Sequence, residues 1–298
     1  MCGIVGLLIK NPAMRTSLGQ LLVPMLEGMG ERGPDSAGLA VFSENGQADM
    51  HRFSLYAPTV DYDWAGLCTA LQSHFEMPAA LETKGKHAVL CTGLKPALFK
   101  PWLVNMHPAL HLLGVGLAMD IYKDIGHPRE VAARYEFTGL RGSHGIGHTR
   151  MATESAVSPA HAHPFTAGED FCLVHNGSLS NPYSLRRQLE AKGIRFETDN
   201  DTEAACRFLE WRMRDGDDLE TALHKAFREL DGFYTLLMGT RNRMALVRDA
   251  FACKPAVVAE TNDYVAVASE FRSLSHLPGI QHARLFEPQP EEIHVWTI

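Results

Sequence analysis

The chain lacks the features that would place it in a membrane, in a secretory pathway or on nucleic acid. No apolar run among its 298 residues is long enough to span a bilayer. Leu7-Leu8-Ile9 is too short, and lacks the basic region before it, to be a signal peptide. Lysine and arginine number 28 against 35 acidic residues, and a net charge of −7 disfavours nucleic acid or an anionic membrane as a partner. We therefore expect a cytoplasmic protein.

Motifs that hold metals or cofactors are also scarce. The six cysteines form no Cys-x-x-Cys pair, which disfavours a zinc site, an iron–sulfur cluster and a disulfide framework. The sequence contains no Rossmann glycine fingerprint and no P-loop. His161 and His163 precede Pro164, but no third ligand follows at a useful spacing, so packing in a loop is the favoured interpretation. We expect no metal and no cofactor on this chain.

The residues that are present predict a globular protein rich in strands. Apolar and alternating segments predict strands at residues 2–9, 36–42, 87–91, 112–119, 145–150, 171–175, 233–239, 244–248, 256–259, 264–269 and 292–297. Helical spacing predicts helices from residue 18, within 61–81, and at 130–135, 201–213 and 218–230. Ser17 and Gln20 match a capping box at the first helix. Many strands with few helices between them favour antiparallel sheets covered by helices. In the absence of linkers or repeats, we expect a single domain over 1–298, with an elaboration at about 50–140.

The second residue of the chain is a candidate nucleophile. Removal of Met1 would give Cys2 both a thiol and a free α-amine. Ordinary pKa values are about 7.7–8.0 for an α-amine and about 8.5 for a thiol, so near neutral pH one group could deprotonate the other. A nucleophile and its general base would then share one residue. A retained Met1 would instead make Cys2 an ordinary internal cysteine, and most cysteines simply pack.

Two arginine-bearing motifs could line a site around that cysteine. Residues 31–38 read Glu-Arg-Gly-Pro-Asp-Ser-Ala-Gly, in which Gly-Pro-Asp predicts a turn and leaves Arg32 unexplained. Residues 145–153 read Gly-Ile-Gly-His-Thr-Arg-Met-Ala-Thr, and alternation along the predicted strand at 145–150 places His148 and Arg150 on one face. A solvated rim position is the ordinary alternative for Arg150, whereas in a site its planar fork suits a carboxylate.

Two further motifs have both structural and chemical interpretations. Asn176-Gly177 follows an apolar strand and predicts a hairpin turn. The same pair could form an oxyanion hole from the asparagine amide and the glycine N–H. Residues 199–203, Asp-Asn-Asp-Thr-Glu, could cap a helix or could offer a carboxylate to a substrate ammonium.

Taken together and in this order, the motifs resemble the class II glutamine amidotransferase domain, a branch of the N-terminal-nucleophile hydrolases. The matching pieces are Met-Cys-Gly-Ile-Val-Gly at the start, Arg-Gly-Pro-Asp-Ser-Ala-Gly at 32–38, Gly-His-Thr-Arg at 147–150, Ala-His-Pro-Phe at 162–165, His-Asn-Gly at 175–177 and Asp-Thr-Glu at 201–203. They extend from residue 1 to about 203, and the resemblance covers the chain to about 270. It implies an α+β fold, a four-layer αββα sandwich of two antiparallel sheets.

The resemblance also implies roles for individual residues. Cys2 would be the nucleophile, its α-amine the base, and Asn176 with Gly177 the oxyanion hole. Arg150 would clamp the glutamine α-carboxylate, and Asp201 would pair with the α-ammonium. Thr153 would contact the substrate, and Arg32 lies in a loop that shapes the site. The sequence departs from the family pattern at Met151, Glu154 and His161, in the rim and lid of the pocket.

The resemblance extends to partners. The middle elaboration and the ending near 298 most resemble stand-alone amidotransferase subunits of glutamate-synthase-like complexes, with the small subunit of N-methylglutamate synthase as the favoured case. The partner subunits would then carry FMN and iron–sulfur clusters. An N-terminal-nucleophile amidohydrolase acting on another amide stays open, as does a non-catalytic regulatory subunit with a vestigial site.

Overall fold

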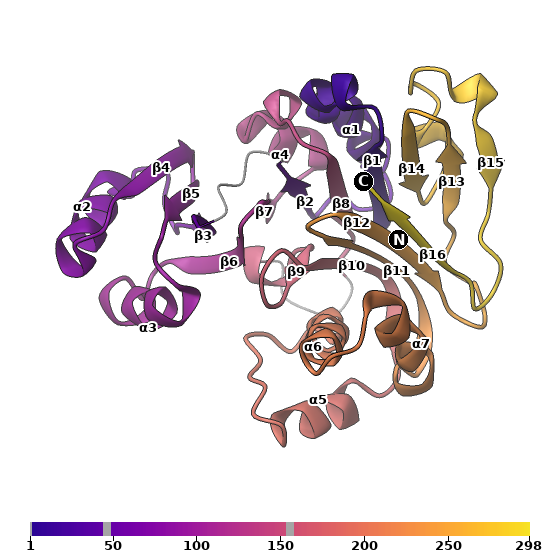
Figure 1. Ribbon diagram of the computed structural model, residues 1–298. Helices are drawn as coiled ribbons and strands as arrows, with labels where there is room; N and C mark the ends of the chain where they lie inside the picture. Colours follow the sequence, from indigo (N-terminus) through magenta and orange to yellow (C-terminus); the bar gives the residue numbers. More distant parts are fainter. Residues whose placement is uncertain (1, 44–48, 153–157) are drawn as a thin grey trace.

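The computed structural model describes residues 2–43, 49–152 and 158–298, and in this part of the chain the strands form sheets of seven, five and four members (Figure 1). The first sheet has the order β15-β13-β14-β1-β8-β2-β7, and every neighbouring pair is antiparallel. Its strands are β1 (Gly3–Ile9), β2 (Ser36–Phe42), β7 (Met119–Ile125), β8 (His144–Arg150), β13 (Val257–Glu260), β14 (Tyr264–Ala268) and β15 (Arg284–Phe286).

The second sheet has the order β16-β12-β11-β10-β9 and is likewise antiparallel. Its strands are β9 (Phe165–Thr166), β10 (Cys172–Leu179), β11 (Gly232–Thr240), β12 (Arg243–Arg248) and β16 (Ile293–Thr297). The predicted hairpin turn at Asn176-Gly177 is wrong, because β10 runs straight through both residues and pairs them with Thr235 and Tyr234.

Helices cover the outer faces of these two sheets (Figure 1). On the seven-stranded sheet lie α1 (Leu18–Glu27) and α4 (Pro128–Arg134), and on the five-stranded sheet α5 (Pro182–Glu190), α6 (Asp201–Arg214) and α7 (Leu219–Glu229). Short 3-10 helices connect the elements at Pro12–Ser17, Phe137–Gly139, Pro159–His161, Phe271–Ser273 and Ile280–His282. The predicted αββα sandwich is confirmed. The predicted capping box is not formed, because Ser17 makes no side-chain cap hydrogen bond.

The N-terminal strand shows why its sequence is apolar almost throughout. Ile4 and Leu8 pack between the two sheets, whereas Val5, Leu7 and Ile9 pack against α1 on the opposite face. A strand in the middle of the sandwich is buried on both faces, so both sets of alternating side chains are apolar. Because β1 lies in the middle of its sheet, Cys2, which precedes it, lies at one end of the space between the two sheets.

The elaboration contains a small sheet of its own, which lies to one side of the sandwich (Figure 1). Its order is β4-β5-β3-β6, with β3 (His51–Tyr56), β4 (Ala79–Lys84), β5 (His87–Thr92) and β6 (His111–Gly116). It packs with α2 (Trp64–Phe75) and α3 (Pro96–Met106) around a separate apolar cluster. We refer to residues 51–116 as the third-sheet module. The sequence analysis missed α3, which begins at a proline in the first turn and tolerates Pro101 within it.

None of the helices in the described ranges is both long enough and apolar enough to cross a membrane.

Candidate active site

Strand register brings Cys2 and Arg150 together. In the β1–β8 pair, Gly3 lies opposite Thr149 and Ile4 opposite His148, so continuing by one residue places Cys2 opposite Arg150. Residues directly opposite in an antiparallel pair project from the same face. Because Ile4 packs between the sheets, Cys2 and Arg150 project toward the end of that same space.

The backbone of Cys2 is held by two side chains. Arg32 Nε donates to the Cys2 carbonyl oxygen at 3.1 Å, and Asn176 Nδ2 donates to it at 3.2 Å. The thiol lies 3.9 Å from the carbonyl oxygen of Met151 and is partly exposed. A Cβ at Gly3 would lie 2.6 Å from the Met29 side chain, so only glycine lets the terminal strand sit this deep.

The amide of Asn176 is oriented by a buried histidine. His148 Nε2 lies 3.1 Å from both Asn176 Oδ1 and the carbonyl oxygen of His175. Both partners are acceptors, so Nε2 carries the proton and donates. Burial lowers the pKa of His148 to about 3, which keeps the ring neutral. With Oδ1 fixed in this way, the amide NH₂ of Asn176 faces Cys2 and Ser269 Oγ, the latter at 3.2 Å.

Gly177 occupies a conformation that other residues rarely adopt. Its φ is 142°, and a Cβ there would lie 2.0 Å from the carbonyl oxygen of Phe233. Position 177 therefore requires glycine because of its backbone conformation within strand β10, and not because the chain turns there. Of the two predicted oxyanion donors, Asn176 contacts the backbone of Cys2 and Gly177 follows it directly in β10; their role stays a prediction.

The Arg-Gly-Pro-Asp segment closes over the end of β8. Asp35 N–H donates to the Arg150 carbonyl oxygen at 3.1 Å, and Asp35 Oδ2 accepts from Ala152 N–H at 2.8 Å. A Cβ at Gly33 would lie 2.4 Å from the Thr149 carbonyl carbon, so this turn needs glycine. The guanidinium of Arg150 is buried, at 5% exposure, rather than solvated on a rim.

The sequence analysis missed two residues that follow β14. Ser269 Oγ accepts from Ile4 N–H at 2.9 Å as well as from Asn176. Glu270 forms ion pairs with Arg32 at 2.6 Å and with Arg272 at 2.7 Å, and the hydrogen bond from Arg32 lowers the pKa of Glu270. Serine and glutamate at the end of an apolar strand carry no motif signal. Arg32 thus holds the backbone of Cys2, and its role in shaping the substrate site stays a prediction.

Asp201 lies on the other side of β10, at the start of α6. One carboxylate oxygen accepts from Leu179 N–H at 2.9 Å, and the other lies 3.7 Å from His175 Nδ1. Burial alone would raise the pKa of Asp201, but His175 and the backbone donors outweigh it and lower the pKa to about 2. A carboxylate held ionised suits a cationic partner, as predicted for a substrate ammonium. Asn200 caps this helix by accepting from Thr202 N–H at 2.8 Å.

The predicted histidine pair in the loop is used for packing and hydrogen bonds. His163 stacks on His148 with ring centroids 4.0 Å apart, and its Nε2 lies 2.9 Å from Thr202 Oγ1. His161 Nε2 lies 3.1 Å from Asp199 Oδ1. No group of three residues suited to a metal occurs in the ranges that the structure describes. Thr153 and Glu154 lie outside the described residues.

The fold and the arrangement around Cys2 define an αββα protein whose candidate site is built around Cys2. Residues 148–276 match the family described as a glutamine amidotransferase domain. Over 297 residues the chain is 46% identical to the glutamine amidotransferase-like protein GlxB of Rhizobium meliloti (strain 1021), covering 99% of this chain and 98% of that relative. The chain belongs to the class II glutamine amidotransferase family.

Longer proteins are similar to part or all of this chain. A glutamine–fructose-6-phosphate aminotransferase (isomerizing) of Aliivibrio fischeri is 39% identical over 124 residues, which are 41% of this chain and 20% of that protein. The glutamine phosphoribosylpyrophosphate amidotransferase of B. subtilis shares the fold at 20% identity, with a TM-score of 0.63 over 99% of this chain. This chain covers 47% of that structure, about half its length.

Proposed function

We propose that this protein is a glutaminase subunit that hydrolyses the side-chain amide of glutamine through Cys2 and supplies the ammonia to a partner synthase. One observation carries the proposal: the Asn176 amide donates to the Cys2 carbonyl oxygen at 3.2 Å, while Arg150 lies opposite Cys2 in the neighbouring strand. A thiol, an oriented amide donor and a buried guanidinium thereby meet at one end of the sandwich.

The chemistry follows from these parts. With Met1 removed, the α-amine takes the thiol proton and the thiolate of Cys2 attacks the amide carbon. The Asn176 amide and the Gly177 N–H stabilise the oxyanion. The amine passes the proton to the leaving nitrogen, the C–N bond breaks, and ammonia departs. Water then hydrolyses the glutamyl thioester, which releases glutamate and restores the thiol.

Selection of free glutamine rests on two charged residues. Arg150 offers a bidentate donor to the α-carboxylate, and Asp201, with its pKa of about 2, stays ionised for the α-ammonium. Hydrogen bonds to charged groups contribute about 1.5–3 kcal/mol each, enough to separate free glutamine from amides without these groups. We also propose Thr153 as a residue that contacts the substrate.

The partner is proposed to be a synthase of the N-methylglutamate-synthase or glutamate-synthase-like type, in the cytoplasm. Ammonia that escapes to bulk water is protonated and is then no nucleophile, so delivery to a bound partner conserves it. FMN and iron–sulfur clusters are proposed for the partner subunits, and none for this chain. The 46% identity to a glutamine amidotransferase-like protein over 99% of this chain supports the glutaminase part of the proposal.

Ammonia release from glutamine tests the proposal. Intact mass first establishes whether Met1 is absent. Cys2→Ala is expected to abolish ammonia release, a loss of at least about 10³-fold, because the variant has no nucleophile. The matched control is Cys253→Ala, which removes an exposed cysteine and should leave the rate unchanged. Appreciable ammonia from Cys2→Ala would refute the role of Cys2, and faster hydrolysis of N-acylated amides than of glutamine would favour the other amidohydrolase function.

A further inference from the structure

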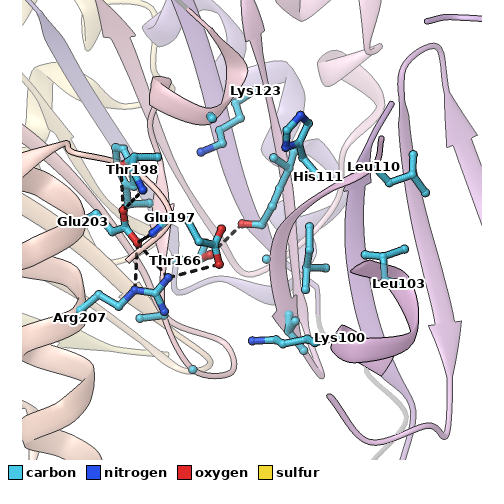
Figure 2. A pocket seen from close by; sticks show the side chains of 18 of the residues that line it. Lys100, Leu103, Leu110, His111, Lys123, Thr166, Glu197, Thr198, Glu203 and Arg207 are labelled. Carbon is cyan, nitrogen blue, oxygen red and sulfur yellow. Dashed lines mark hydrogen bonds and ion pairs between the residues drawn. The ribbon is translucent and has the colours of Figure 1, made fainter. Parts of the chain in front are cut away.

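A cavity of about 330 Å³ lies where the third-sheet module meets the sandwich (Figure 2). One wall comes from α3 and β6 of the module, and the opposite wall comes from β9, α6 and the segment before α6. Neither Cys2 nor Arg150 lines it. Its volume falls in the range of about 300–1,000 Å³ that small-molecule sites occupy.

A buried lysine reaches into this cavity. Lys123 of β7 is 4% exposed, and its Nζ donates to the carbonyl oxygens of Ala162 at 2.8 Å and Pro164 at 3.1 Å. An ammonium has three N–H donors, so these two carbonyls leave one for another partner. Figure 2 shows the side chain extending into the space between Thr198 and His111.

The acidic groups of the cavity already have partners within the protein. Glu203 accepts from the backbone of Glu197 and Thr198, and it forms an ion pair with Arg207 at 3.0 Å. Glu197 also contacts Arg207, at 3.4 Å. Within the described part of the chain, no carboxylate forms an ion pair with Lys123. Its Nζ lies 4.9 Å from the centroid of the Phe165 ring, and a buried cation without a counter-ion is costly.

The charges and the walls together indicate one kind of ligand. Two glutamates and one arginine give this cluster a charge of −1, whereas Lys123 and the exposed Lys100 add +2, so the cavity as a whole carries +1. That balance suits a monoanion better than a phosphate dianion. The other lining residues are largely apolar: Leu103, Val104, Leu110, Leu112, Leu113 and Phe165. An apolar body would pack against this wall.

We propose that this cavity is a binding site for a small organic monocarboxylate, whose carboxylate is held by Lys123 and whose apolar chain packs against α3 and β6, with Lys100 adding positive charge elsewhere on the cavity wall. The site is separate from the glutaminase site and does not depend on its activity. The protonation of Lys123 is compatible with this role, because burial lowers its pKa to about 8 against the opposing effect of Glu197 and Glu203, so the amine is mostly charged at pH 7.

Calorimetric titration of the full chain at pH 7 tests the site, with hexanoate as the probe and 1-hexanol as its uncharged match. Hexanoate is expected to bind at least tenfold more tightly than 1-hexanol, because only the carboxylate pairs with Lys123. Lys123→Met should weaken hexanoate binding by about 10- to 100-fold. Equal affinity for the two probes would overturn the proposal.

Two exposed positions keep the test valid if Lys123→Met fails to fold. Lys100→Glu reverses a charge at the cavity and should weaken hexanoate binding about tenfold. Val104→Trp, at a residue that is 67% exposed, should block the apolar wall and abolish binding while all charges are kept. Lys192→Glu is the matched charge reversal away from the cavity and should bind hexanoate as the wild type does. If Lys100→Glu and Val104→Trp both bind hexanoate with wild-type affinity, the anion is bound elsewhere, the clamp at Arg150 included, and the proposal is wrong.

Discussion

The candidate active site and the cavity beside the third-sheet module are built in different ways. The active site gathers residues that lie within short motifs, because adjacent strands place consecutive residues side by side and glycine is needed where backbones touch. Gly3, Gly33 and Gly177 each have another residue within 2.6 Å of an added Cβ. The cavity instead collects single side chains from α3, β6, β7 and α6, and its walls need only suitable size and polarity. A site that depends on close backbone contact leaves a pattern in the sequence, whereas a site built from scattered side chains does not.

The third-sheet module and the active-site region also differ in the kind of side chains that they bury. The third-sheet module has its own apolar cluster, which includes Phe53, Phe99 and Trp102. The active-site region contains buried polar groups instead, among them His148, Asn176 and Thr202. Apolar clusters tolerate volume-conserving changes, whereas buried polar networks lose function when one member is removed.

The oxyanion donor should show the largest effect. Asn176→Ala is expected to lower kcat of glutamine hydrolysis by about 10²–10³-fold, because one oxyanion donor is lost. Ser269→Ala is the matched control: it removes the other partner of the Asn176 amide but leaves the donor, and it should cost much less. Steady-state kinetics of ammonia release measure both variants. Equal losses in the two would mean that Asn176 acts only through packing.

The carboxylate clamp comes next. Arg150→Lys should raise KM for glutamine by about 10–100-fold with little change in kcat, because lysine keeps the charge but cannot form two parallel hydrogen bonds. The same substitution at exposed Arg141 serves as control and should change neither constant. A loss confined to kcat would contradict a binding role for Arg150.

Mild acid should destabilise the sandwich more than the module. In the sandwich, burial lowers the pKa of His144 and His148 to about 3 and the pKa of His163 well below its usual value. In the module, burial lowers the pKa of His87 to about 4 and also lowers the pKa of His107. Below about pH 6.5 the unfolded chain binds protons that the folded chain does not, so stability falls as pH falls.

Each such histidine should raise the unfolding equilibrium constant by up to about tenfold per pH unit. Asp201 does not contribute in this window, because its folded pKa of about 2 matters only below about pH 4. Urea unfolding midpoints at pH 7 and pH 5 measure the effect, and hydrogen exchange locates it. Identical midpoints, or earlier exchange in β5 than in β8, would contradict the assignment.

A core change in the module should have the smallest effect on catalysis. Leu71→Ala is expected to lower stability by about 2–5 kcal/mol while kcat/KM stays within about twofold, since fully buried Leu71 lies in the separate cluster. Leu173→Ala makes the same deletion in β10, three residues before Asn176, and should lower kcat as well as stability. Thermal unfolding and glutaminase assays on both variants decide the matter. A large catalytic loss in Leu71→Ala would show that the module supports the active site directly.

The sequence by itself determined the strand-rich sandwich and the ordered motifs, and it predicts Cys2 as the nucleophile. Apolar runs on β1, β8 and β10 and glycines at forced close contacts are local consequences of burial, and local patterns are visible in a single chain. It misled at Asn176-Gly177, where the turn propensity of the pair was overridden by the pairing of β10 with β11.

Only the tertiary structure decided which isolated side chains meet. Ser269 and Glu270 join the site across more than 230 residues, through Ile4 and Arg32. Lys123 faces a cavity whose walls come from both the module and the sandwich. Such contacts depend on how sheets and helices pack. A side chain that acts through a partner far away in the sequence belongs to no local motif, so the sequence alone does not reveal its role.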